Sequence, residues 1–153
     1  MDKKTVIFDL DGTLALIDTR RDLSMVSGKR DWDVFFDPKN IDLDQPNVPV
    51  IKMAQMLDSQ GFDIVVFSGR SVRTQDVTID WLKKHDVPFD TIKMRPTSPY
   101  WHFMSETDLK QFWLDRYFPN KDNIFAVFDD RQQVVDMWRQ NGLTVFQVAD
   151  GDF

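Results

Sequence analysis

The stretch DLDGTL, residues 9–14, decides how this chain is organised, because it directly follows a short apolar run at residues 5–8. That run is β-branched, as in a fully buried strand, and the glycine and threonine behind the acidic residues favour a sharp turn. Residues i and i+2 of a strand share a face, so Asp9 and Asp11 are expected to face one site beyond the strand. Two carboxylates there are costly unless a cation or several hydrogen-bond donors compensate their charge. The stretch therefore indicates a metal site and a reaction.

The composition indicates a soluble globular protein with one domain, residues 1–153. The chain has 153 residues, of which 42% are hydrophobic, and this suits a single domain with a sizeable core. Its net charge of −6 argues against binding along an extended duplex, but not against gripping one terminal phosphate. The absence of cysteine excludes disulfides, thiolate zinc sites and a cysteine nucleophile.

The sequence has no run that is typical of export or membrane insertion. The first apolar run is interrupted at Asp9, too early for a signal peptide, and no other run approaches membrane-spanning length. We therefore expect a cytoplasmic protein without membrane contact.

Hydrophobic patterning beyond the first strand predicts that strands and helices alternate. Strands are expected at residues 63–67, 90–94, 123–128 and 143–148, and helices at residues 50–57, 75–85, 105–117 and 132–140. This alternation is typical of an α/β fold with a parallel sheet, right-handed crossovers and helices on both faces. Active sites of such sheets lie beyond the carboxyl ends of the strands.

Polar clusters follow three of the expected strands. Asp9 and Asp11 follow the first strand, the sequence Ser-Gly-Arg at residues 68–70 follows the second, and Asp129 and Asp130 follow the strand at residues 123–128. Because the carboxyl ends of parallel strands meet at one edge of a sheet, the three clusters are expected to form one site.

Residues 15–44 are expected to form a small insertion after the first strand, ending near residue 45. The segment is rich in charged and aromatic residues and shows no sustained periodicity, so we expect a long loop. Two interpretations stay open. The segment is a lid or substrate-selecting element, or it is a surface excursion whose aromatic residues pack on the core.

These motifs resemble, in their order, those of the haloacid dehalogenase (HAD) superfamily. The matching elements are DLDGT at residues 9–13, SGR at residues 68–70, Lys110, and the aspartate pair at residues 129–130. Closer similarity lies in VVFSGR (65–70), FDDRQQVVDMWR (128–139) and QVADGDF (147–153), which resemble the 3′-phosphatase domains of phage polynucleotide kinase/phosphatases. The resemblance implies the Rossmann-like, three-layer HAD fold and a phosphatase, located in the host cytoplasm if the chain is phage-encoded.

The resemblance also implies a role for each catalytic candidate. Asp9 would be the nucleophile that becomes an aspartyl-phosphate, and Asp11 would be the general acid that later activates water. Lys110 would neutralise the charge on Asp9 and the phosphoryl group. Ser68 and Thr13, with nearby backbone N–H groups, would hold the phosphoryl oxygens.

Mg²⁺ is the cofactor that the resemblance implies. Its ligands would be Asp9, the backbone carbonyl of Asp11, and Asp129 or Asp130. A carboxylate is a weak nucleophile and is repelled by a phosphate, so a cation has to neutralise the approach, and Mg²⁺ prefers oxygen ligands. One departure is Glu106, which stands four residues before Lys110, where the family leads us to expect aspartate.

The candidate substrate-binding residues are Gly69, Arg70, Arg95 and Arg30. Guanidinium groups suit phosphate oxygens, and the small insertion leaves an open site that suits the end of a polynucleotide. The first hypothesis is therefore a Mg²⁺-dependent polynucleotide 3′-phosphatase, which repairs DNA or RNA ends by leaving a 3′-hydroxyl.

Two other functions stay open. One is a nucleotidase or small-molecule phosphomonoesterase with the same chemistry. The other is a non-enzymatic phospho-acceptor or binding domain, which is less favoured because no catalytic group is missing. The chain contains no GxxxxGK[ST] motif, so kinase activity is not expected, and a kinase or ligase would be a separate partner. The sequence does not predict an oligomeric state.

Overall fold

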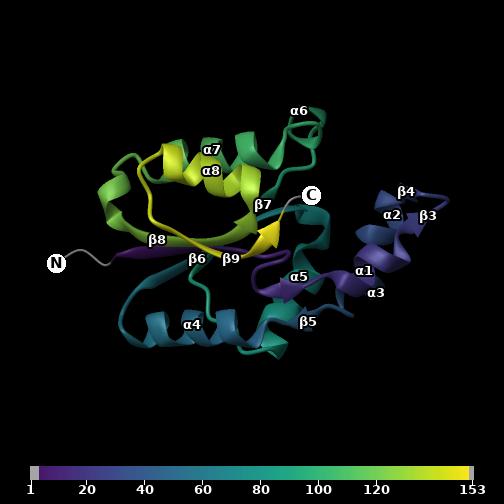
Figure 1. Cartoon of the computed structure of the whole chain (residues 1–153), viewed down its shortest axis with the longest axis horizontal. Helices are drawn as coiled ribbons and strands as arrows, with labels where there is room; N and C mark the ends of the chain where they lie inside the picture. The colour runs from purple at the N-terminus through teal and green to yellow at the C-terminus, as the bar shows by residue number, and fades with distance from the viewer. Residues whose placement is uncertain (1–3, 152–153) are drawn as a thin grey trace.

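A parallel sheet of five strands forms the centre of the computed structural model, which describes residues 4–151 (Figure 1). All four pairs of neighbouring strands are parallel. In their order across the sheet, the strands are β7 (Thr91–Arg95), β6 (Asp63–Ser71), β1 (Thr5–Asp9), β8 (Ile124–Arg131) and β9 (Val145–Gly151). The predicted α/β class with a parallel sheet is confirmed.

Helices cover both faces of the sheet, as expected (Figure 1). One face carries α7 (Glu106–Tyr117) and α8 (Gln132–Gln140). The other face carries α4 (Val48–Ser59) and α5 (Gln75–Lys84). The result is the three-layer arrangement of helices, sheet and helices.

Strand β1 is buried on both sides, because it lies in the middle of the sheet. Its side chains alternate between two hydrophobic clusters: Val6 and Phe8 belong to the cluster that includes α4 and α5, and Ile7 belongs to the cluster of α7 and α8. Since residues i and i+2 of a strand share a face, Asp9 points to the same side as Ile7, towards α7.

The strands that carry polar motifs are longer than predicted. β6 continues through the Ser-Gly-Arg motif, because Ser71 pairs with Arg95 of β7 after a shift in register that follows Phe67. β8 continues through the aspartate pair, because Arg131 pairs with Gly151 of β9. β9 itself begins two residues later than expected and runs to Gly151. The polar motifs therefore lie where the register of the ladder shifts, and strand pairing resumes beyond them.

The prediction of a long loop over residues 15–44 was wrong. Two of the short helices are held by aspartate caps: Asp31 accepts from the N–H groups of residues 33 and 34, and Asp37 accepts from that of residue 39. Segments this short have no room for helical periodicity, so the sequence pattern did not reveal them. The elements are β2 (Ala15–Leu16), α1 (Asp18–Leu23), β3 (Met25–Val26), β4 (Lys29–Arg30), α2 (Trp32–Phe35), α3 (Pro38–Ile41) and β5 (Gln45–Pro46).

Three short helical turns complete the described chain. They are η1 (Val72–Thr74), α6 (Pro99–His102) and η2 (Lys121–Asn123). Within residues 4–151, no helix combines the length and the hydropathy that crossing a bilayer requires.

Candidate active site

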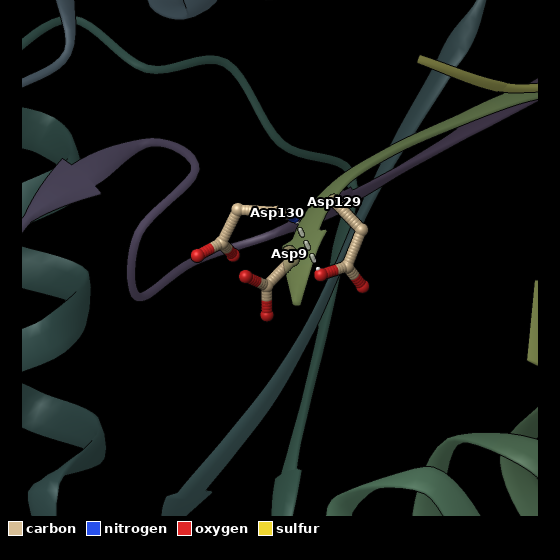
Figure 2. Close-up of side chains that lie close together, drawn as sticks. All are labelled: Asp9, Asp129 and Asp130. Atoms are coloured by element: carbon tan, nitrogen blue, oxygen red, sulfur yellow. Dashed lines mark hydrogen bonds between the residues drawn. The ribbon is translucent and has the colours of Figure 1, made fainter. Parts of the chain in front are cut away.

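Three carboxylates meet at the carboxyl ends of β1 and β8. Figure 2 shows Asp9, Asp129 and Asp130 with their carboxylates close together, and one oxygen from each lies within 4.8 Å of the other two. All three residues are at most 4% exposed. The backbone N–H of Asp130 donates to Oδ1 of Asp129 (2.8 Å), which fixes the orientation of that carboxylate. The structure thus brings together two of the polar clusters that the sequence singled out.

Gly12 allows the turn after β1 to pass close to Asp130. Its φ is +85°, and a Cβ at this position would overlap the Asp130 carboxylate. The turn is closed by backbone hydrogen bonds, from the N–H of Gly12 to the carbonyl of Ala15 (2.8 Å) and from that of Leu14 to the carbonyl of Leu10 (3.0 Å). Both properties of glycine, a free φ and no side chain, are used here.

Thr13 and Ser68 are both buried at the site. The Thr13 hydroxyl lies 3.0 Å from Oδ2 of Asp9 and 3.1 Å from Oδ1 of Asp130, and its single proton is donated to one of them. The Ser68 hydroxyl accepts from the backbone N–H of Arg70 (3.1 Å). In this structure Thr13 therefore links the carboxylates, and the contact of both hydroxyls with phosphoryl oxygens stays a prediction.

Lys110 places a buried positive charge beside Asp9. Helix α7 begins at a Ser105 cap, whose hydroxyl accepts from the N–H of Asp108 (3.1 Å), and this start directs Lys110 at the sheet. Its Nζ lies 2.6 Å from Oδ1 of Asp9 and 3.3 Å from Oδ2 of Asp129. Burial alone would lower the pKa of Lys110, but the surrounding carboxylates raise it well above its usual value. Lys110 is therefore a fixed cation.

Glu106 connects Lys110 to a second cation. Its Oε1 lies 2.9 Å from Nζ of Lys110, and its Oε2 lies 2.8 Å from Nη1 of Arg131. Burial acts to raise the pKa of Glu106, but these two cations lower it. The longer side chain, found where the family leads us to expect aspartate, still reaches the lysine.

The acid cluster holds more negative than positive charge. Burial raises the pKa of Asp9 well above its usual value, the charge of Asp129 raises it further, and Lys110 offsets only part of this. Burial likewise raises the pKa of Asp130. A divalent cation would relieve the same repulsion, and carboxylate oxygens are the ligands that Mg²⁺ prefers. The donor set therefore fits a divalent metal.

Asp11 lies between two buried arginines. Its Oδ1 accepts from Nη2 of Arg20 (2.7 Å) and from Nε of Arg70 (3.0 Å), and its side chain remains 23% exposed. Burial acts to raise the pKa of Asp11, but the two guanidinium groups outweigh it and lower the pKa far below its usual value. Asp11 is ionised in this arrangement, and its role as an acid stays a prediction.

Sequence reasoning missed Arg20 and Asp44, which belong to the insertion. Arg20 is fully buried and binds Asp44 with two nitrogens, Nε to Oδ1 (2.8 Å) and Nη2 to Oδ2 (2.9 Å). The carbonyl of Asp44 also accepts from Nε1 of Trp81 (2.9 Å) on α5. The available signal was weak: Ile17, Arg20 and Ser24 have the spacing of one helix face, but the pattern extends over less than two turns.

Arg70 enters the site but is engaged with protein groups. It is 1% exposed, its Nη2 lies 3.1 Å from Oδ2 of Asp44, and its Nη1 donates to the Thr78 hydroxyl (3.0 Å). Together with its bonds to Asp11, these contacts engage every nitrogen of the guanidinium. Direct contact between Arg70 and a phosphate stays a prediction.

The other two candidate arginines bind backbone. Arg95 donates from Nε to the carbonyl of Gly69 (3.1 Å) and from Nη1 to those of Trp101 and Met104 (2.6 Å each). Arg30 donates from Nη1 to the carbonyl of Arg21 (2.5 Å) and to the Ser24 hydroxyl (2.7 Å), both within the insertion. The structure thus places Arg95 and Gly69 beside the site, while the contacts described for Arg30 lie within the insertion.

Comparison with known proteins identifies the family. The model of the family described as "Polynucleotide kinase PNKP phosphatase domain" matches residues 3–153. The chain belongs to this family. The predicted HAD phosphatase family is therefore confirmed, and the acid cluster and Lys110 form the candidate active site of a PNKP phosphatase domain.

Relatives of this PNKP phosphatase domain are longer proteins. A protein of Autographa californica nuclear polyhedrosis virus, assigned as a bifunctional polynucleotide kinase/RNA ligase, is 34% identical over 95% of this chain and 19% of its own length. A chain in a solved structure of a Pnkp1/Rnl/Hen1 complex is 32% identical, with a TM-score of 0.79 over 98% of this chain and 47% of that one. The present chain thus spans about a fifth and about half of these relatives.

More distant structures share the fold. A class C acid phosphatase from Bacillus anthracis has a TM-score of 0.66 with 19% identity, covering 100% of this chain and 69% of the other. At this identity the comparison supports the three-layer fold alone.

Proposed function

We propose that this chain is a Mg²⁺-dependent phosphatase that removes 3′-phosphates from polynucleotide ends through an aspartyl-phosphate on Asp9. The observation that carries the proposal is the position of Asp9: a buried carboxylate at the end of β1, held 2.6 Å from Lys110 and beside two further aspartates. A structural acid has no need of such surroundings, whereas a nucleophile that attacks an anion does.

The metal ligands of the proposal are Asp9, the carbonyl of Asp11, and Asp130. Asp130 is preferred to Asp129, because Asp129 already accepts from the N–H groups of Asp130 and Arg131 and from Nε1 of Trp138. A bound Mg²⁺ supplies charge that allows the carboxylate and the phosphate to approach each other.

The first half of the reaction forms the bond between Asp9 and phosphorus. An oxygen of Asp9 attacks the phosphorus, the bond from phosphorus to the 3′-oxygen breaks, and the leaving oxygen takes a proton from Asp11. The charge of Lys110 favours the ionised form of Asp9, and the Thr13 hydroxyl orients the carboxylate. Asp11 has to be protonated at this point. The negative charge of the bound phosphate offsets the positive charges of Arg20 and Arg70, and this raises the pKa of Asp11 so that it takes up a proton.

The second half of the reaction releases phosphate. Asp11, now ionised, accepts a proton from water as the water oxygen attacks the phosphorus, and the bond to Asp9 breaks. Arg20 and Arg70 stabilise this ionised form through their ion pairs with Asp11. The active site returns to its starting charge after one turnover.

The substrate class is inferred from the relatives. Two proteins more than 30% identical to this chain carry the names of nucleic-acid repair enzymes, a kinase/RNA ligase and a Pnkp1/Rnl/Hen1 assembly. We infer that DNA or RNA 3′-phosphate ends are the substrate, that a kinase or ligase is a partner, and that the protein works in the cytoplasm.

The test is the release of phosphate in Mg²⁺ from matched oligonucleotides carrying a 3′- or a 5′-phosphate and from mononucleotides. The 3′-phosphorylated oligonucleotide should have the highest kcat/KM. A mononucleotide that performs equally well would instead support a nucleotidase. Asp9→Asn should abolish turnover with an unchanged circular dichroism spectrum, while Asp58→Asn, on the exposed side of α4, should not change activity.

A further inference from the structure

Two aromatic side chains at α6 are exposed to an unusual extent. Phe103 is 85% exposed and Tyr100 is 72% exposed, more than any other aromatic residue in the part of the chain that the structure describes. Tyr100 and Phe103 are three residues apart in the sequence. Neighbouring rings exposed to this extent are typical of binding surfaces, because rings of this size are usually at least partly covered.

These rings lie beside the candidate active site. Arg95 joins the α6 segment to β6, since the same guanidinium donates to the carbonyls of Gly69, Trp101 and Met104. Gly69 stands directly after Ser68, and the side chain of Glu106 lies against it. Figure 1 shows α6 in the layer of α7, at the end of the molecule where the strand arrows point.

The α6 segment is anchored, so its exposed rings have defined positions. Trp101 packs edge-on against Phe112 of α7, with ring centroids 4.9 Å apart, and belongs to the margin of the hydrophobic cluster under α7 and α8. The Tyr100 ring is edge-on to Trp101 (5.1 Å), and the Phe103 ring is edge-on to His102 (4.8 Å). Trp101 therefore anchors the segment to α7, while Tyr100 and Phe103 remain exposed to solvent.

We propose that Tyr100 and Phe103 form a stacking platform for the last unpaired bases before a 3′-phosphate. This inference rests on the proposed function and assigns its substrate class: ends whose terminal nucleotides are single-stranded. Bases stack on aromatic side chains irrespective of sequence, and a base paired in a duplex is already covered by its neighbours. Contacts connect Asp9 to α6: Lys110 binds Asp9 and Glu106, the side chain of Glu106 lies against Gly69, and Arg95 joins Gly69 to α6. In the proposal, the bases that precede the 3′-phosphate follow this line of residues to the two rings.

Charge supports stacking as the main source of affinity. The chain has a net charge of −6, so it lacks the surface that would follow a backbone over many phosphates. One exposed cation, Arg73, lies two residues beyond Ser71, which pairs with Arg95. A short single strand with one or two phosphate contacts and stacked bases fits this surface, and its affinity should depend only weakly on salt.

The test is the binding of a fluorescein-labelled single-stranded octamer with a 3′-hydroxyl, measured by anisotropy with the unmodified chain and with Tyr100→Ala/Phe103→Ala. We expect the double variant to bind about tenfold or more weakly, since stacking on one aromatic ring changes affinity by this order. Phe125→Ala is the matched control, because Phe125 is 52% exposed and lies at the amino end of β8. It should bind like the unmodified chain.

A second substrate makes the test specific for bases. The second octamer has no bases on its last three nucleotides. The unmodified chain should bind it as weakly as the double variant binds the normal octamer. The double variant should bind both octamers with the same affinity. If the unmodified chain and the double variant bind the normal octamer equally well, the proposal is overturned. It is also overturned if replacing the normal octamer with the abasic one weakens binding by the same factor in both proteins. A change of oligomeric state in sedimentation velocity, with unchanged binding, would assign the rings to a protein interface instead.

The binding test needs no turnover, so it separates the two proposals. If the chain releases no phosphate from any 3′-end but the double variant still loses affinity, the proposed function fails and the platform stands. If phosphate is released, the ratio of kcat/KM for the single-stranded oligonucleotide to that for a nucleoside 3′-phosphate should fall about tenfold in the double variant. An unchanged ratio overturns the platform alone.

Discussion

The Nζ of Lys110 lies 2.6 Å from Oδ1 of Asp9, although the two residues are 101 positions apart in the sequence. The contact joins α7 to the end of β1 and is fully buried on the lysine side. It gives the carboxylate a permanent counter-charge that does not exchange with solvent. Its removal should therefore slow the reaction, because the buried carboxylates lose this counter-charge.

Lys110→Met should lower kcat by about 10²–10³-fold, the loss typical when one fixed stabilising group is removed from an active site. Phosphate release from a 3′-phosphorylated oligonucleotide measures it. Lys52→Met is the matched control, because Lys52 is exposed on α4, and it should keep full activity. Near-normal turnover in Lys110→Met would contradict the assigned role.

Divalent cations should raise the melting temperature, and more so at pH 8 than at pH 5. Burial raises the pKa of Asp9 and Asp130, so without a cation the folded state binds protons more tightly than the unfolded state. The associated stability is present at low pH and is lost as the pH rises through the raised pKa values. A cation replaces the protons. Melting curves in chelator and in Mg²⁺ test this, and a pH-independent shift would refute it.

Gly12→Ala should abolish most activity, whereas Gly28→Ala should leave activity intact. Both glycines have a positive φ, +85° and +79°, so both substitutions carry a similar backbone cost of about 1–2 kcal/mol. Only at Gly12 would the added Cβ overlap the Asp130 carboxylate, since nothing lies within 4 Å at Gly28. Thermal unfolding measures the backbone strain, which both variants share, and kcat/KM measures the effect of displacing Asp130, which only Gly12→Ala should show. Equal activity losses in the two variants would exclude this explanation.

Arg20→Met should lower the free energy of unfolding by about 3–5 kcal/mol, because it leaves Asp44 buried with part of its charge unpaired. Urea denaturation measures the change. Adding Asp44→Leu should cost less than the sum of the two single substitutions, since the second removes the charge that the first exposes. Lys39→Met, at an exposed position of the same insertion, should change stability by less than about 0.5 kcal/mol. If the double substitution cost as much stability as the sum of the two single substitutions, Arg20 and Asp44 would not be energetically coupled.

The sheet and the acid cluster could be predicted because their signals are local. A buried strand that ends in Asp9 is visible within ten residues, and the same holds for the strand before Asp129. Parallel pairing then brings such ends together without further information. Lys110 was identified as a site residue only through the family resemblance, because hydrophobic patterning alone would treat it as a solvent-exposed lysine on a helix.

The partners of Arg70 could not be predicted, because they depend on packing between distant segments. The sequence suggested a free guanidinium for phosphate, but Asp44 arrives from the insertion and Thr78 from α5. The short helices around Arg20 follow the same rule: their positions depend on caps and buried ion pairs, which leave little periodicity. Local patterns thus predicted the reacting groups, and tertiary contacts determined how their charges are balanced.

The ion pair between Arg20 and Asp11 makes the insertion part of the acid–base chemistry. Arg20 belongs to α1 of the insertion, and the carboxylate it binds belongs to the turn after β1. Any movement that withdraws α1 would also withdraw one of the two cations that lower the pKa of Asp11. The position of the insertion therefore sets the acidity of Asp11: a displaced insertion would leave a weaker acid behind it.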